Sequence, residues 1–319
     1  MTVSVNKESV KIVDEMISQA DVLGIKCFFS KVGSTIIDCG IEVPGGYQAG
    51  LYVAKVCLGG LGAVALNLRR YDDFYIPVIE EFIDNPIIAC MASQYAGWSI
   101  KYENFTALGS GPARALALKP KKLFQKIGYK DDFDEAVIVL ETSKYPPDGA
   151  LVEISNKCSI NPKNLYVIVV PTNSIAGSIQ VSSRIVEVGM HRLDTLGFEL
   201  KSIVYGAGVC PIAPVHPDPT IMIGRTNDAI IYAGEVDLMI VYDKDEDLKS
   251  IVKNASSDAS SSYGKTFYEI FKEAGFDFYK VDPKIFAPAS ITLRNISTGR
   301  SYRSGTVNRK LLIRSFELE

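Results

Sequence analysis

The stretch NLYVIVVP at residues 164–171 decides the fold. It is continuously apolar from 165 to 170, which is typical of a parallel strand that is buried on both faces. AVIVLE at 136–141 has the same character, and DGALVEISNKCSI at 148–160 lies between the two and reads as a helix. A further helix at 182–196, ended by Gly197, leads to the strand FELKSIVY. This β-α-β-α-β order predicts an α/β fold of layered, mixed sheets flanked by helices.

The segment before residue 125 has a different order of expected helices and strands. Asn6 is the expected N-cap of a helix over 6–22. Two strands, a helix and then more strand material are expected after it, at IKCFF, STIIDCGI, PGGYQAGLYVAKVCLGG, GAVALNL, FYIPVIEEF and NPIIACMAS. The change predicts an N-terminal α/β domain over 1–125 and a C-terminal one over 126–319 that carries the 182–196 helix. Interleaving of the two domains along the chain stays open.

The C-terminal third predicts a strand at 236–243 and a polar surface loop over 245–262. A helix around KTFYEIFKEA then leads to a strand at GFDFYKV. This order repeats the helix-Gly-Phe-strand pattern of HRLDTLGFELKSIV, so an internal duplication and a common helix-glycine joint both remain open. The last segment, from 291 to 317, reads as a closing hairpin.

Composition excludes several classes of protein. The 319 residues carry a net charge of −3 with no polybasic run, which argues against nucleic acid and membrane-surface partners. No apolar run approaches the roughly 18 residues that span a bilayer. The six cysteines are dispersed and only two histidines are present. We therefore expect reduced thiols in a cytoplasmic protein and no metal site.

Three segments are candidates for chemistry, and SSRIVEVGMHRLDTL at 182–196 is the first. Arg184, Glu187 and His191 are three and four residues apart and share one face of the expected helix. A solvated ion pair explains this spacing, and so does a buried, functional pair. The preceding TNSIAGS follows the carboxyl end of an expected parallel strand, where open sheets bind ligands.

The second candidate, ALGSGPARAL, offers the backbone amides of Gly109, Ser110 and Gly111 and the charge of Arg114 to an anion. A tight turn before a short helix explains it equally. The third is the stretch 205–235, with four prolines between 211 and 219, which predicts a long irregular binding loop. In it, Arg225 and Asp228 either bind substrate or pair with each other.

Several motifs in order make the chain resemble the methenyltetrahydromethanopterin cyclohydrolase family over its whole length: VNKESVKIVDEM, STIIDCGIEVPGG, KVCLGGLG, ALGSGPARAL, SSRIVEVGMHRL and YGAGVCPIAPVHPDPTIMIGRTNDAIIYAGE. The resemblance implies a metal-free, cytoplasmic hydrolase of archaeal one-carbon metabolism and methanogenesis. It also implies a homotrimer, with two α/β domains flanking a pocket in each subunit. The family's catalytic arginine and glutamate match Arg184 and Glu187.

The implied reaction interconverts 5,10-methenyltetrahydromethanopterin plus water and 5-formyltetrahydromethanopterin. Glu187 is the expected general acid/base, oriented by Arg184. The pterin derivative is a coenzyme-substrate, and no prosthetic group is expected. Substrate-binding candidates are Asn173 and Ser178 for the pterin, and Gly109, Ser110, Gly111, Arg114 and Arg225 for the anionic tail. A non-catalytic pterin- or nucleotide-binding protein and a folate-type cyclohydrolase or amidohydrolase are the alternatives.

Overall fold

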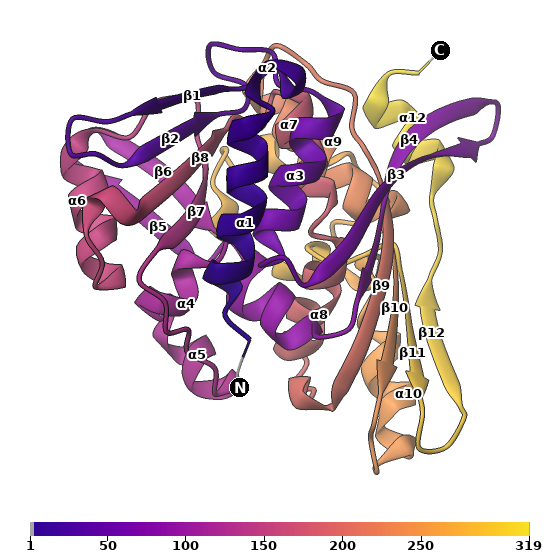
Figure 1. Ribbon diagram of the computed structural model, residues 1–319. Helices are drawn as coiled ribbons and strands as arrows, with labels where there is room; N and C mark the ends of the chain where they lie inside the picture. The colour runs from indigo at the N-terminus through magenta and orange to yellow at the C-terminus, as the bar shows by residue number, and fades with distance from the viewer. Residues whose placement is uncertain (1–2, 319) are drawn as a thin grey trace. The chain divides into compact units, whose positions relative to one another are not determined.

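Two six-stranded mixed sheets, each packed against helices, form the protein, and a computed structural model describes its residues 3–318 (Figure 1). The α/β class expected from the sequence is confirmed. The chain divides into two interleaved units. Unit 1 comprises the chain up to Ala63 together with Ile87–Gln180, and unit 2 comprises Val64–Pro86 together with the chain from Val181 onward.

The boundary expected near residue 125 differs from this division, because it falls inside helix α5 (Lys121–Ile127) of unit 1. Strand β6 (Phe105–Ser110) pairs with β7 (Ala136–Glu141) across that position, so a break at 125 would divide one sheet. The interleaved arrangement is the one the structure has.

Unit 1 has the strand order β1-β2-β8-β7-β6-β5, with β8 (Leu165–Val170) parallel to both of its neighbours. Its other elements are α1 Val5–Ser18, α2 Ala20–Leu23, β1 Lys26–Phe29, β2 Thr35–Asp38, α3 Tyr47–Cys57, the π-helix η1 Ile87–Gln94, β5 Trp98–Tyr102, α4 Ala113–Ala117, α6 Asp148–Cys158 and the 3-10 turn η2 Pro162–Asn164. Helix α7 (Ile175–Ser182) crosses into unit 2.

Strand β8, and β7 up to Leu140, are apolar because helices cover both of their faces. On one face Val137 and Ile168 pack in a cluster with residues of α1 and α3, which lie side by side in Figure 1. On the other face Ile138 and Val167 pack with residues of α6. Alternate side chains of one strand thus enter two cores, as the uninterrupted apolar runs predict.

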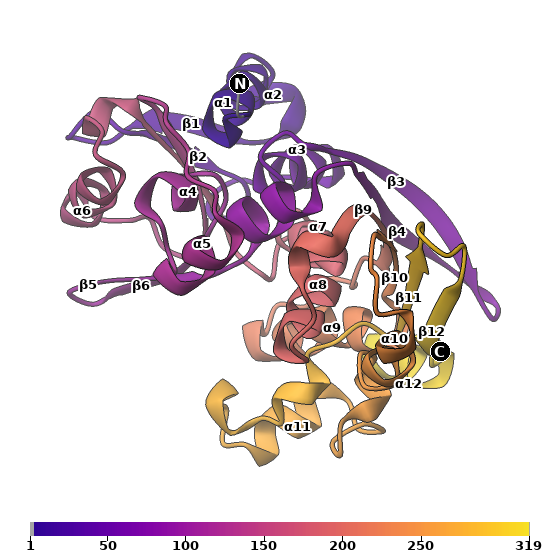
Figure 2. The ribbon, with the colours of Figure 1, turned by 90° about the horizontal axis from the view of Figure 1, so that it is seen from below.

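Unit 2 has the strand order β12-β11-β10-β9-β4-β3. Its elements are β3 Gly62–Tyr71, β4 Phe74–Ile83, α8 Ile185–Thr195, η3 Leu200–Ser202, β9 Ile203–Pro211, α9 Pro219–Ala233, β10 Glu235–Ile240, α10 Asp245–Lys253, η4 Ser257–Ala259, α11 Phe267–Glu273, η5 Phe278–Lys280, η6 Pro283–Ile285, β11 Ser290–Asn295, β12 Ser301–Gly305 and α12 Arg309–Phe316. Figure 2 shows α8 and α9 on one side of the strands β9 to β12. The opposite face of this sheet carries a groove.

The expected N-cap of the first helix is wrong. Helix α1 begins two residues earlier than Asn6 requires, because the side chain of Ser4 accepts a hydrogen bond from the Lys7 N–H. Asn6 is instead fully buried. Its Nδ2 donates to Asp131 Oδ2 at 2.7 Å, and its Oδ1 accepts from the Val137 N–H at 3.1 Å. The amide therefore ties α1 to the start of strand β7.

Three segments have a structure different from the one expected. NPIIACMAS forms the π-helix η1, since a short apolar run does not distinguish a buried strand from a buried helix. The expected loop over 245–262 contains α10, which buries Leu248 and Val252, four residues apart on one face. The expected irregular stretch over 205–235 is largely β9 and α9, because Asp218 caps α9 and Pro219 opens it.

GFDFYKV forms the 3-10 turn η5 and not a strand, so the second copy of the supposed duplication lacks its strand. The hairpin β11–β12 is confirmed, whereas RKLLIRSFE forms helix α12 and is not part of it. The strands and helices expected at 25–29, 34–41, 44–60, 136–141, 148–160 and 164–171 are confirmed, with ends that differ by a few residues.

Candidate active site

The helix expected over 182–196 is confirmed as α8, which begins three residues later than expected because the chain breaks after helix α7. Helix α7 ends at Ser182 and α8 begins at Ile185, and Arg184 is the N-cap of α8. The Arg184 N–H donates to Val181 O at 3.1 Å. Glu187 lies three residues on, in the first turn of α8. Both side chains are buried, with 8% of Arg184 and 5% of Glu187 exposed. Their burial argues against a solvated ion pair.

Three glycines of unit 2 place this first turn directly on the sheet. A Cβ on Gly208 of β9 would lie 2.7 Å from Ile185 Cγ2 and 2.8 Å from Val186 Cγ2. A Cβ on Gly206 would lie 2.8 Å from Val186 Cγ1, and one on Gly234 would lie 2.3 Å from Ile185 Cδ1. The glycines of the YGAGVC motif therefore let α8 approach β9 closely, and this contact fixes the position of the first turn, which carries Arg184 and Glu187.

Gly208→Ala is expected to displace the first turn of α8. The added methyl group has no room against Ile185, and overpacking of this kind costs about 1–3 kcal/mol of unfolding free energy. If Glu187 is the acid/base expected from the sequence, kcat should fall by more than tenfold, because the displacement moves its carboxylate. Urea unfolding and steady-state kinetics measure both effects. Ala207→Ser, on the opposite face of the same strand, is the control. Unchanged kcat in Gly208→Ala would contradict the argument.

The position of Glu187 suits a carboxylate. The first turn of a helix has unpaired N–H groups and a positive end of the helix dipole, both of which stabilise negative charge. Burial removes competing water and strengthens these interactions. A buried carboxylate in the first turn of a helix, three residues after an arginine cap, has the chemistry that a general acid/base requires.

In unit 1, Asn173 and Ser178 follow the carboxyl end of β8, Asn173 half-buried before α7 and Ser178 buried within it. Glu141, the last residue of β7, lies at the same edge of the sheet. It accepts hydrogen bonds from Thr172 Oγ1 and, at 3.2 Å, from Gln180 Nε2. This polar cluster was not predicted, although a glutamate that ends a buried parallel strand is a legible signal.

The Gly109–Arg114 turn is engaged with the main chain of unit 1. Arg114 is fully buried. Its Nε donates to Lys119 O at 2.9 Å and its Nη1 to Ser93 O at 3.0 Å. Its guanidinium carbon lies 5.2 Å from the centre of the Tyr95 ring. Gly111 has φ +93 and donates its N–H to Ser93 O. These contacts favour the structural interpretation, and anion binding by Gly109, Ser110, Gly111 and Arg114 stays a prediction.

Arg225 and Asp228 bind different partners, although both lie on α9. Arg225 is 6% exposed, and its Nη2 lies 2.6 Å from Glu317 Oε2. It lines a cavity of about 330 Å³ at the C-terminal end of the chain. Asp228 accepts hydrogen bonds from the Phe267 N–H at 2.8 Å and from Ser315 Oγ at 2.6 Å. Asp228 therefore joins α9 to α11 and α12.

Asp228 makes stability depend on pH. Burial raises the pKa of its carboxyl to about 7, from a reference of 3.8. Between these two values the folded state holds the proton and the unfolded state has lost it, so the unfolding free energy falls as pH rises. The loss is about 4 kcal/mol and is complete above pH 7. Asp228→Asn is expected to flatten this dependence in urea unfolding between pH 4 and 8. An unchanged slope would contradict the assignment.

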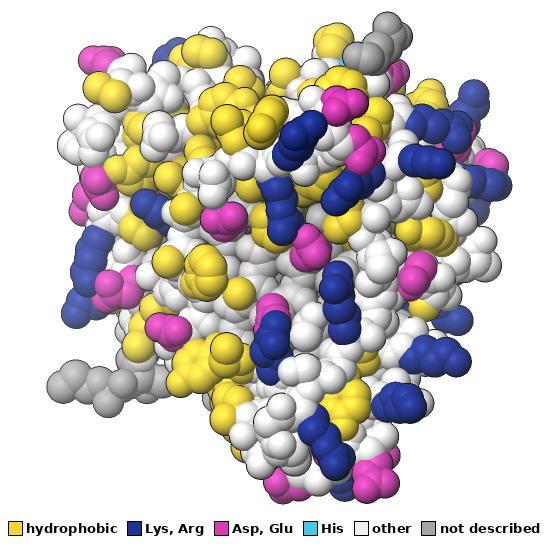
Figure 3. Space-filling view, turned by 90° about the vertical axis from the view of Figure 1, so that its right-hand side faces the viewer, with side chains coloured by type: hydrophobic (Ala, Val, Ile, Leu, Met, Phe, Trp, Pro, Cys, Tyr) yellow, Lys and Arg dark blue, Asp and Glu magenta, His cyan; other side chains and the backbone are white. Residues whose placement is uncertain are grey.

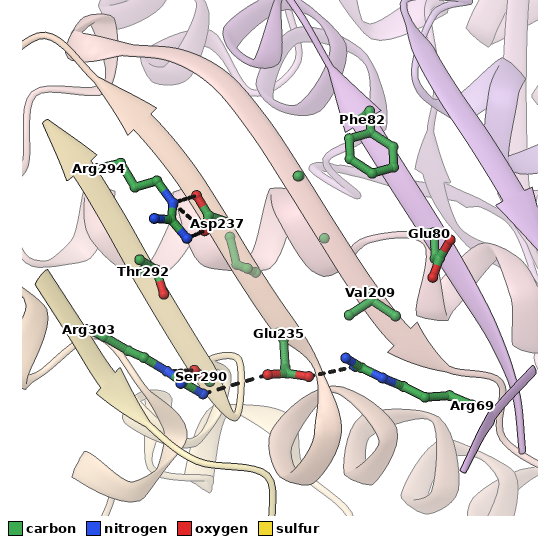
Figure 4. A pocket seen from close by; sticks show the side chains of 13 residues that line it. Arg69, Glu80, Phe82, Val209, Glu235, Asp237, Ser290, Thr292, Arg294 and Arg303 are labelled. Carbon is green, nitrogen blue, oxygen red and sulfur yellow. Dashed lines mark hydrogen bonds and ion pairs between the residues drawn. The ribbon is translucent and has the colours of Figure 1, made fainter. Parts of the chain in front are cut away.

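The groove on the outer face of the unit 2 sheet encloses about 360 Å³. Figure 4 shows its ion pairs: Glu235 lies between Arg69 and Arg303, at 2.6 and 3.7 Å, and Asp237 binds Arg294 at 2.7 Å. Figure 3 likewise shows Lys and Arg interspersed with Asp and Glu over the face in view. Among the described residues that line this groove, none is a site residue predicted from the sequence.

Comparison with known proteins decides the family. A family model described as Cyclohydrolase (MCH) matches residues 4–316. The chain belongs to the cyclohydrolase family. It is 44% identical over 317 residues to the methenyltetrahydromethanopterin cyclohydrolase of Methanococcoides burtonii, covering 99% of each chain. Proteins with the same name from Methanothermobacter marburgensis and Methanocaldococcus jannaschii are 45% and 42% identical. These matches cover 99% and 98% of this chain and 100% and 98% of the relatives.

Membership of the cyclohydrolase family confirms the resemblance carried by the sequence motifs, and the protein is an enzyme of the hydrolase class. Across residues 3–318, the helices are all too short or too polar to cross a membrane. The same residues contain no group of three or more His, Cys, Asp or Glu side chains arranged to hold a metal ion.

Proposed function

We propose that the enzyme interconverts 5,10-methenyltetrahydromethanopterin plus water and 5-formyltetrahydromethanopterin. The observation that carries the proposal is the buried carboxylate of Glu187 in the first turn of α8, three residues after the cap Arg184. The names of the relatives, which match along nearly the whole chain, supply the substrate class.

The methenyl carbon is bonded to two nitrogens and shares a positive charge with them, so it is already electrophilic. Glu187 takes a proton from the water whose oxygen attacks this carbon. It then transfers a proton to the departing nitrogen as the ring opens and the adduct's hydroxyl becomes the formyl carbonyl. In balance, the methenyl cation and water give the neutral formyl group and one proton. A positioned acid/base contributes about 10²–10⁴-fold to such a step.

Arg184 has two roles in this proposal. Its guanidinium orients Glu187 and favours the ionised carboxylate. Its charge also disfavours the cationic substrate more than the neutral product or a charge-dispersed transition state, which promotes ring opening. The helix-sheet contact at Gly208 supports both roles, because it holds the first turn of α8 in place.

The contacts of the substrate complete the proposal. We assign the pterin to Asn173 and Ser178, which follow the carboxyl end of β8 in unit 1. For the anionic tail we assign Arg225 in unit 2, and the turn of Gly109, Ser110, Gly111 and Arg114 in unit 1. The coenzyme-substrate is used without a prosthetic group. A homotrimer rests on the resemblance, and a cytoplasmic location is supported by six free cysteine thiols.

The absorbance of the methenyl chromophore tests the reaction directly. We expect the purified enzyme to remove this absorbance with the tetrahydromethanopterin derivative, and to do so much more slowly with the tetrahydrofolate derivative. A non-catalytic binding protein would leave the absorbance unchanged with both. Equal rates with the two derivatives would favour a folate-type cyclohydrolase.

A further inference from the structure

Glu81 is a fully buried carboxylate that the proposed mechanism does not use. It lies on β4 of unit 2, between Glu80 and Phe82. Figure 4 shows Glu80 and Phe82 on the groove side of that strand. Successive side chains of a strand point to opposite faces, so Glu81 lies on the helix-covered face.

The start of α8 lies over this part of the sheet. Glu81 is paired in register with Gly208 of β9, and Gly208 is the position where a Cβ would meet Ile185 and Val186 at 2.7–2.8 Å. Burial raises the pKa of the Cys210 thiol, two residues further along β9, and the charge of Glu81 raises it as well. Glu81 is therefore in the row of the sheet on which the first turn of α8 rests.

The other buried charges of unit 2 are held elsewhere. Arg192 donates to Asn254 O, Arg225 pairs with Glu317, Asp228 accepts from Ser315, and Asp245 pairs with Arg300. The remaining buried carboxylates and guanidinium groups described for this unit are Glu81, Arg184 and Glu187. All three lie at the start of α8 or in the strand row beneath it. When all are ionised, two carboxylates and one guanidinium carry a formal charge of −1.

We propose that Glu81 is a positioning residue that acts through Arg184. Its buried carboxylate offsets the charge of the guanidinium, so the added charge of Glu187 gives the site a net negative charge, which favours a cationic amidinium substrate. The inference rests on the proposed function and adds a determinant of substrate charge. Arg184 alone would repel the methenyl cation as well as orient Glu187. With Glu81 beneath α8, the site keeps the oriented acid/base and still binds a cation.

The two substrates of the reversible reaction differ in charge, which makes the proposal testable. The methenyl form is a cation at the reacting carbon, whereas the formyl form is neutral there. Loss of the Glu81 charge should weaken binding of the methenyl form and leave binding of the formyl form unchanged. If the ring-opening kcat is also unchanged, the fixed overall equilibrium requires the ring-closing kcat to fall by the same factor as the methenyl KM rises.

The experiment compares Glu81→Gln with Glu80→Gln in the full-length enzyme, with kinetics followed in both directions by methenyl absorbance. For Glu81→Gln we expect a methenyl KM about tenfold higher at unchanged ring-opening kcat, and an unchanged formyl KM with a ring-closing kcat about tenfold lower. Glu80→Gln, which removes the neighbouring charge from the opposite face, should behave as wild type. Glu81→Asp keeps the charge and should restore the methenyl KM to within about threefold of wild type.

A methenyl KM that stays at the wild-type value in Glu81→Gln would overturn the inference. An equal rise of the methenyl and formyl KM values would also overturn it, and so would a Glu81→Gln variant that does not fold. Either of these two results would make Glu81 a structural residue. Thermal unfolding of the three variants separates these outcomes. If Glu187→Gln is inactive while Glu81→Gln matches wild type, this inference alone fails. If Glu187→Gln remains active, the proposed function of that residue fails independently.

Discussion

Glu187→Gln is expected to lower kcat for ring opening by about 10²–10⁴-fold, the usual contribution of a positioned acid/base. Glutamine has nearly the same shape as glutamate but neither accepts a proton from water nor returns one. Burial makes the effect large, because Glu187 is 5% exposed and bulk water does not easily replace it. The methenyl KM should change much less than kcat. Stopped-flow absorbance measures both quantities.

Glu246 provides a matched control for this substitution. It also lies in the first turn of a helix, α10, but its side chain is exposed. Glu246→Gln should leave kcat and the unfolding free energy close to wild type, because exposed first-turn carboxylates contribute only about 0.3–1 kcal/mol. Should Glu187→Gln keep more than a tenth of wild-type activity, another group must be the acid/base.

Arg184→Gln should lower kcat by about 10²-fold, the usual loss on removing one preorganised charged donor. Glutamine retains a hydrogen-bond donor but neither the charge nor the forked geometry of the guanidinium. Since this positive charge opposes the cationic substrate, the methenyl KM should stay constant or fall. A raised methenyl KM with unchanged kcat would contradict this role and would make Arg184 a binding residue only.

Arg184→Lys separates charge from geometry. The ammonium keeps the positive charge but does not make two parallel bonds to one carboxylate. We expect it to recover less than a tenth of the lost kcat while returning the methenyl KM to its wild-type value. The pair of substitutions therefore shows whether orientation of Glu187 or the charge itself determines the rate.

The sequence predicted those parts of the fold in which the hydrophobic pattern is compatible with only one type of secondary structure. Strand β8 is a continuous apolar run of six residues and β7 has five apolar residues before Glu141, and no other element explains such runs in an α/β alternation as simply. NPIIACMAS is equally apolar, but it forms a π-helix, because length and composition do not separate the two cases. Helix α10 was missed because only two of its apolar side chains, Leu248 and Val252, are buried, in a highly charged segment.

The candidate site was predictable to a similar degree. The spacing predicted that Arg184 and Glu187 lie on one side of a helix, and the resemblance implied their roles. The break between α7 and α8 could not be predicted from the amino-acid sequence. Glu80 and Glu81 are adjacent residues of the same type, but they point to opposite faces of the sheet, so that Glu80 lines a groove and Glu81 is fully buried. Such a difference depends on which strand pairs with which, and β4 pairs with β9, more than 120 residues later in the chain.

The pairing of β4 with β9 has a consequence for biosynthesis. Strands β3 and β4 belong to unit 2, but they are translated between the two segments of unit 1. When they leave the ribosome, strand β9, with which β4 pairs, has not yet been translated. During that interval the ribbon exposes unpaired N–H and C=O groups, which are a template for association with other chains. Stalled or truncated translation products that contain β4 but end before Ile203 would therefore be prone to aggregate.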